Sequence, residues 1–223
     1  MKIVTICLCL VLGFSSCQAS TKKEKEIEIV DQQGLVKLVE SKNIKAVESA
    51  LKAGQDVNTV DANKRNLLLI ATINQDLPMV KLLVSFKADV NQQADNLDSP
   101  FLYAGATGQT EMLKLFLENG ARFDVFNRYH GSALIPACER GHVETVRLLA
   151  NTKGYPIDHV NRLGWTALME AIVLANGSKK YQEIVQILKD AGSKMDIPDK
   201  DGISPLQHAK NRGFKEIVKI IEG

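Results

Sequence analysis

The stretch Gly141-His142-Val143-Glu144-Thr145-Val146-Arg147-Leu148-Leu149 decides the fold, because its apolar residues recur at the spacing of one helical face. Leu148 is expected to belong to that buried face, so that its loss would leave a cavity. Equivalent apolar stripes occur at 79–83, 112–116, 184–188 and 217–221. The chain is therefore predicted to consist of repeated amphipathic helices.

Three columns of residues set the length of the repeat. The alanines Ala71, Ala104, Ala137, Ala171 and Ala209 are 33, 33, 34 and 38 residues apart. A column of Asn58, Asn91, Asp124, Asp158 and Asp196 has the same intervals, and Gly54, Lys87, Gly120, Gly154 and Gly192 lie four residues before it. Glycine there suits the left-handed residue that ends a helix. The agreement of the columns indicates internal repeats.

Each repeat is predicted to contain two short helices and a turn. Ser99-Pro100 and Ser204-Pro205 are typical helix starts, because serine caps the helix and proline occupies its first position. Turn-rich segments separate the repeats at 61–65, 94–98, 127–131, 161–165 and 199–203. These segments are expected to form hairpin-like tips.

The pattern resembles the ankyrin repeat. The best matches are 141–149 and 201–206, followed by Gly164-Trp165-Thr166-Ala167-Leu168. The resemblance implies an all-α fold, an α-solenoid of helix-turn-helix units joined by hairpin-like loops. About six units are expected over residues 31–223, at 31–58, 59–91, 92–124, 125–158, 159–196 and 197–223. The resemblance is specific for the fold and says little about function.

The N-terminus has the layout of a secretory signal peptide. Met1-Lys2 is followed by an apolar segment to Phe14 that is too short to span a bilayer. Phe14-Ser15-Ser16-Cys17 resembles a bacterial lipobox, although that motif usually has Leu where Phe14 stands. The resemblance implies removal of residues 1–16, lipid attachment at Cys17 and a place in the bacterial envelope. The polar residues that follow Cys17 are expected to make 17–30 a solvated tether. The alternative is cleavage after Ala19, which would give a soluble periplasmic or secreted protein.

Composition argues against several classes of partner. The 28 Lys and Arg against 26 Asp and Glu give a net charge of +2, so no basic field for nucleic acid is expected. The cysteines at 7, 9, 17 and 138 have neither zinc-site nor disulfide-framework spacing. A membrane contact is expected only through the lipid on Cys17.

No catalytic or metal-binding pattern stands out. His130, His142, His159 and His208 lack metal-ligand spacing; His142 matches a structural position of the repeat, and the others are expected to be exposed. Cys138 is expected to be a small buried thiol. Neither Gly-x-Ser-x-Gly nor a phosphate-binding Gly-rich loop occurs. The protein is therefore expected to be no enzyme and to bind no cofactor or metal.

The resemblance implies a partner-binding groove along the tips and the first helix of each unit. Arg128, Tyr129, Arg140, Arg162 and Trp165 are the principal candidates, because Arg, Tyr and Trp often anchor interfaces. The other candidate contacts are Lys200, Arg212, Arg65 and Asp98. Trp165 could instead pack on the adjacent tip. Five extra residues around 176–180 could contact a partner or be a tolerated surface insertion.

These observations predict an exported, monomeric adaptor that binds an unidentified protein through the groove of its last three units. An inhibitor or immunity-like protein that masks an envelope or host enzyme is the alternative, and a purely structural role is a third possibility.

Overall fold

The computed structural model describes residues 31–223. The predicted signal peptide at 1–16, the lipid-attachment residue Cys17 and the tether at 17–30 lie outside the described residues. Over 31–223, no helix has the length and apolar character that crossing a membrane requires.

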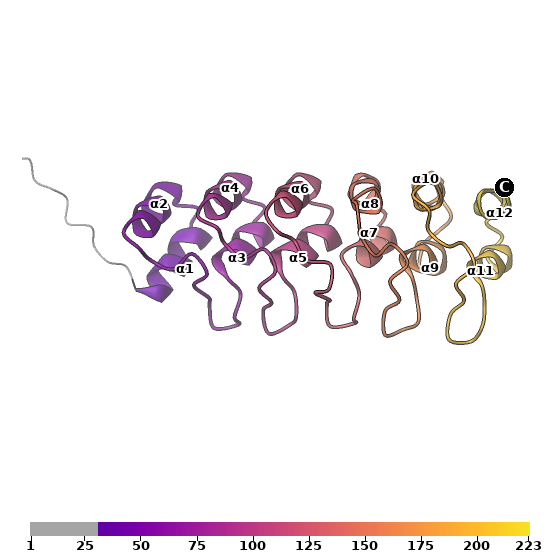
Figure 1. Cartoon of the computed structure of the whole chain (residues 1–223), viewed down its shortest axis with the longest axis horizontal. Coiled ribbons are helices and arrows are strands. Elements are labelled where there is room, and N and C mark those ends of the chain that lie inside the picture. The colour runs from indigo at the N-terminus through magenta and orange to yellow at the C-terminus, as the bar shows by residue number, and fades with distance from the viewer. Residues whose placement is uncertain (1–30) are drawn as a thin grey trace, which may run out of the picture.

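Twelve helices form six consecutive pairs over residues 31–223, and no strand occurs there (Figure 1). The predicted all-α solenoid is confirmed. The helices are α1 Gln32–Glu40, α2 Ile44–Lys52, α3 Leu67–Ile73, α4 Leu77–Ser85, α5 Pro100–Ala106, α6 Thr110–Glu118, α7 Leu134–Arg140, α8 Val143–Ala150, α9 Ala167–Val173, α10 Lys179–Asp190, α11 Pro205–Asn211 and α12 Lys215–Glu222.

The helices lie in two rows, and each helix packs on its partner and on the equivalent helix of the next unit. The odd-numbered helices, the first of each pair, form one row, and loops project beyond them on one side (Figure 1). We call the surface between these loops and the first helices the concave face.

The five predicted tips are confirmed as hairpin-like loops. In each tip the N–H of the first residue donates to the carbonyl of the fifth, at 2.9–3.1 Å. Asp61, Asn127, Asn161 and Asp199 also accept backbone N–H groups of their own tip on a side-chain oxygen. These side chains fix the turn because they satisfy donors that would otherwise be unpaired.

Side-chain caps define where most of the first helices begin. Ser99 and Ser204 cap α5 and α11 with proline next to them, as predicted. Helix α7 differs, because Ala133 offers no capping oxygen. There the hydroxyl of Tyr155 accepts the N–H of Leu134 at 3.1 Å. Pro136 lies in the first turn of α7, where backbone N–H groups have no acceptor within the helix, so the N–H that proline lacks breaks no helical hydrogen bond.

The core is a continuous apolar layer between neighbouring units. In α8 the side chains of Val146 and Leu149 are 0% exposed. The expectation that Leu148 lies in the core is wrong, because Leu148 is half-buried and only packs against it. The large cavity cost expected for Leu148 therefore belongs to Leu149.

The extra residues of the fifth unit are only partly a loop. Lys179 and Lys180 begin α10, which has 12 residues where α8 has 8. The hydroxyl of the buried Tyr181 donates to the carbonyl of Glu139 at 2.9 Å, at the end of α7. The insertion is thus held against the preceding unit.

Candidate functional site

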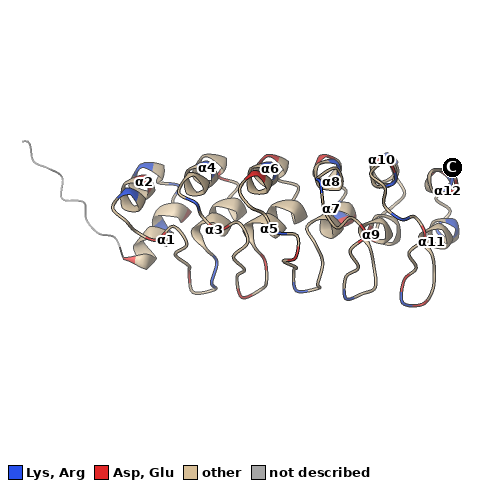
Figure 2. Cartoon of the chain, in the orientation of Figure 1, with Lys and Arg blue, Asp and Glu red and all other residues tan. Residues whose placement is uncertain are grey.

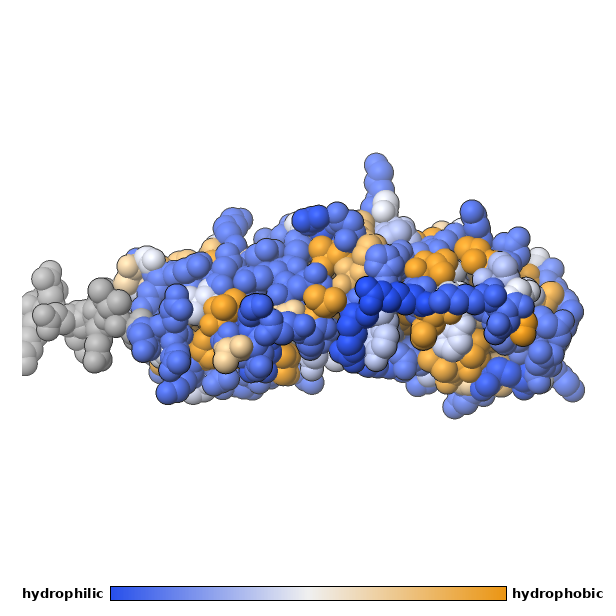
Figure 3. All heavy atoms as spheres, turned by 90° about the horizontal axis from the view of Figure 1, so that it is seen from below, coloured by the Kyte–Doolittle hydropathy of each residue, from blue (hydrophilic) through white to orange (hydrophobic). Residues whose placement is uncertain are grey.

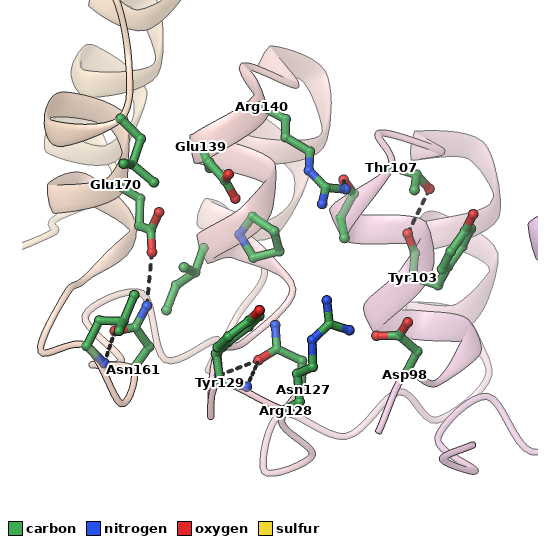
Figure 4. A pocket seen from close by; sticks show the side chains of 16 residues that line it. Asp98, Tyr103, Thr107, Asn127, Arg128, Tyr129, Glu139, Arg140, Asn161 and Glu170 are labelled. Atoms are coloured by element: carbon green, nitrogen blue, oxygen red, sulfur yellow. Dashed lines mark hydrogen bonds between the residues drawn. The ribbon is translucent and has the colours of Figure 1, made fainter. Parts of the chain in front are cut away.

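The concave face contains a cavity of about 390 Å³ that spans the third, fourth and fifth units (Figure 4). Its walls come from three first helices, α5, α7 and α9, and from the tips that precede them. Its lining includes Asp98, Tyr103, Arg128, Tyr129, Ile135, Pro136, Glu139, Arg140, Asn161, Leu163, Glu170 and Leu174.

Four of the predicted contact residues line this cavity: Asp98, Arg128, Tyr129 and Arg140. The Arg128 guanidinium lies over the Tyr129 ring, 5.0 Å from its centroid. Arg140 donates through Nη1 to the carbonyl of Ala106 at 2.6 Å. Burial raises the pKa of Asp98, and the charges of Arg128 and Arg140 act in the opposite direction. The cavity end near the third unit therefore holds two cations and one carboxyl group.

The other predicted basic residues lie outside the cavity, and several of them join neighbouring units. Arg162 donates to the carbonyls of Tyr129 and Arg128, through its backbone N–H at 2.9 Å and through Nη1 at 3.2 Å. Lys200 donates in turn to the carbonyl of Arg162. These side chains hold adjacent tips together, and Lys200 belongs to the sixth unit, which the cavity does not reach.

Arg212, Arg65 and Trp165 also lie outside the lining. Arg212 donates to the carbonyl of Ala175 at 2.6 Å, and Arg65 pairs with Asp61 of its own tip at 2.6 Å. Trp165 is half-buried rather than fully exposed. Figure 2 shows basic and acidic residues interspersed over the tips and helices, without a face of a single charge in that view.

Glu170 is a site residue that the sequence analysis missed. It is the one charged residue of α9, and it is only 4% exposed although it lines the cavity. Its Oε1 accepts the side-chain N–H of Asn161 at 3.0 Å. Burial and the neighbouring Glu139 raise the pKa of Glu170 to about 7, while the Asn161 hydrogen bond lowers it. A lone acid within an otherwise apolar helix was the signal that could have found it.

Cys138 and the histidines make packing and hydrogen-bond contacts within the repeats rather than forming a reactive site. Cys138 is fully buried, and burial raises the pKa of its thiol well above the ordinary value. His130 is exposed, as expected. His208 and His159 are half-buried, so the expectation of exposure is wrong for them. Nε2 of His208 lies 2.7 Å from Asp199 Oδ2, and the His159 ring stacks on Phe126. Within 31–223 no three His, Cys, Asp or Glu side chains are grouped so that they could hold a metal ion.

Comparisons with known proteins point to one family. A family model described as ankyrin repeats in three copies matches residues 35–127 and 108–190. YahD of Escherichia coli strain K12, whose name describes it as an ankyrin repeat protein, is 36% identical over 180 residues, which make up 80% of this chain and 89% of that protein. The crystal structure of an ankyrin repeat domain from Acinetobacter baumannii AYE has a TM-score of 0.83 and 43% identity, and the match covers 86% of this chain and 97% of that one. The ankyrin repeat protein EF0377 has a TM-score of 0.81 and 38% identity, with 84% and 96% covered.

Proposed function

The chain belongs to the ankyrin repeat family, and from that premise we propose that it is a non-catalytic module that binds a partner protein through the cavity of its third to fifth units. The fold supports the proposal, since ankyrin repeat proteins are generally interaction modules. A stacked solenoid is already ordered, so little ordering free energy would be lost on binding.

The observation that carries the proposal is a concentration of exposed apolar side chains. Tyr129, Leu163 and Leu174 are 52%, 50% and 50% exposed, and all three line the cavity. Only Leu97 and Val160 among the described residues are other large apolar side chains of comparable exposure. Figure 3 shows the face that carries the tips as mostly hydrophilic, with separate hydrophobic patches. A concave apolar patch with a charged rim is typical of a protein-binding site.

Cross-linking and affinity capture from an envelope extract would test the proposal. A Tyr129→Ala, Leu163→Ala variant should lose a captured protein that the wild type retains. A Leu97→Ala, Val160→Ala variant is the matched control, because it removes exposed apolar area outside the cavity and should capture the same protein. Equal capture by all three forms would place the interface elsewhere, and capture by none would argue against an adaptor.

We further propose that the protein is exported and lipid-anchored through Cys17. The apolar segment that ends at Phe14 and the Ser15-Ser16-Cys17 sequence support this. A Cys17→Ala variant should move from the membrane fraction to the soluble fraction. Cys9→Ala is the control, because Cys9 would be removed with the signal peptide, and it should stay with the membrane. A soluble wild type would favour cleavage after Ala19 instead.

A further inference from the structure

Two carboxyl groups from neighbouring units face the cavity without a basic partner. Glu139 lies on α7 and Glu170 on α9, and Figure 4 shows their side chains at the same end of the pocket. Within residues 31–223 neither forms an ion pair. Oε1 of Glu170 accepts from Asn161, and Oε2 has no hydrogen-bond partner among the described residues. Glu170, which is only 4% exposed, thus has one carboxyl oxygen free to accept a hydrogen bond from a donor outside the chain.

The arrangement is unfavourable for the protein alone. A buried carboxylate needs a compensating charge or hydrogen bonds, and a second acid nearby adds repulsion. Both effects raise the pKa of Glu170 to about 7, with burial as the larger cause. A cation placed between the two groups would relieve the repulsion and compensate the burial together.

The two basic residues that line the cavity, Arg128 and Arg140, make their contacts at its other end. The Arg140 guanidinium donates a hydrogen bond to the carbonyl of Ala106 in the third unit. Arg128 stacks on Tyr129 and acts electrostatically on Asp98. Figure 4 shows both guanidinium groups on the side of the pocket away from Glu170. The cation that fits beside Glu139 and Glu170 must therefore come from a ligand.

The walls next to the acids are apolar. Leu163 in the tip and Leu174 after α9 are each 50% exposed, and Ile135 and Pro136 line the same space. We propose that the cavity takes a partner segment that places one Lys or Arg side chain between Glu139 and Glu170 and an adjacent apolar side chain against Leu163 and Leu174. This inference rests on the proposed function, since it names the chemistry of the segment that the groove would bind.

Selection from a phage-displayed library of random peptides on the immobilised full chain would test the inference. The wild type should enrich peptides with Lys or Arg at one fixed position beside an apolar residue. A Glu139→Gln, Glu170→Gln variant should lose the basic preference. Glu40→Gln, Glu118→Gln is the matched control, because it removes the same charge from exposed acids outside the cavity and should keep the preference. Circular dichroism melting would verify that each variant is folded.

A synthetic copy of an enriched peptide gives the quantitative readout by fluorescence polarisation. The double cavity variant should bind it at least about tenfold more weakly, as expected for loss of a desolvated charge pair. Replacing the basic residue of the peptide by its uncharged analogue should weaken wild-type binding by a similar factor. When both changes are made together, the affinity should fall by less than the product of the two separate fold-losses, as expected if the two groups contact each other.

The outcomes separate this inference from the proposed function. Peptides that need Tyr129 and Leu163 but show no basic preference would overturn the inference and leave the groove as a binding site. A basic preference that persists in the Glu139→Gln, Glu170→Gln variant would also overturn it. Enriched peptides that ignore both cavity variants, or no enrichment at all, would overturn both.

Discussion

The carboxyl group of Glu170 makes the stability of the solenoid depend on pH. Its pKa is raised from 4.5 to about 7 by burial and by Glu139, so the folded state disfavours the ionised form. The stability associated with the protonated group is complete below about pH 4.5 and is lost as the pH rises through 7. Glu170→Gln keeps an oxygen for Asn161 and removes the charge. The variant should be more stable than the wild type at pH 8 by on the order of 2–3 kcal/mol, with little difference at pH 4.5.

Thermal unfolding of both proteins across that pH range would measure the effect. Because groups remote from Glu170 titrate equally in both forms, the difference between the two melting temperatures reports on Glu170 and on its repulsion with Glu139. A difference that is the same at pH 4.5 and pH 8 would show that folding does not raise the pKa of Glu170.

The backbone conformation of Lys87 lowers the free energy of unfolding. It occupies the left-handed region with φ of 66° in the column where Gly54, Gly120 and Gly192 stand. A side chain there costs about 1 kcal/mol or more, which exceeds the chain entropy that glycine adds to the unfolded state. Lys87→Gly should therefore stabilise the protein by about 0.5 kcal/mol, measured by urea unfolding. Lys114→Gly, inside α6, is the control and should destabilise it by about 1 kcal/mol.

At the scale of the elements, the extended start of α10 completes the end of α7. The carbonyls of Glu139 and Arg140 at that end accept from the Tyr181 hydroxyl at 2.9 Å and from Lys180 Nζ at 3.5 Å. These carbonyls have no partner inside their own helix. Tyr181→Phe should therefore lower the free energy of unfolding by about 1 kcal/mol. Tyr103→Phe removes a hydroxyl that forms no hydrogen bond within residues 31–223, and it should be close to neutral in the same denaturant titration.

The elements show which parts could be predicted from sequence. Caps, stripes and tips are local, so Ser99-Pro100 and the tip at 161–165 could be recognised without knowing the neighbouring units. The direction of a side chain on a tip depends on the rise and rotation between units. For that reason Arg162 was predicted to contact a partner, although the structure directs it to the carbonyls of the preceding tip. Glu170 was missed for the same reason, because its burial arises only when α9 packs beside α7.

At the scale of the whole molecule, stability is expected to be a sum over units and their neighbours. Each described helix packs on its partner and on the adjacent unit, so long-range contacts do not cross the array. Removing residues 59–91 deletes one complete unit and leaves α5, α7 and α9 in place. That variant should remain helical and cooperative and should keep a cavity that binds the same partner.

Two further deletions test whether whole units are the parts that can be removed. Removing residues 125–158 should also leave a folded array, but it takes away α7 with Arg128, Tyr129 and Glu139, so binding should be lost. Removing only residues 59–76 takes away one tip and α3 and leaves α4 without its partner, so it should destabilise the protein more than the longer deletion of 59–91. Circular dichroism melting and capture of the partner would compare the three forms. If the deletion of 59–91 abolished binding while the array stayed folded, the interface would have to extend into the second unit, and a cavity confined to the third to fifth units could not account for recognition.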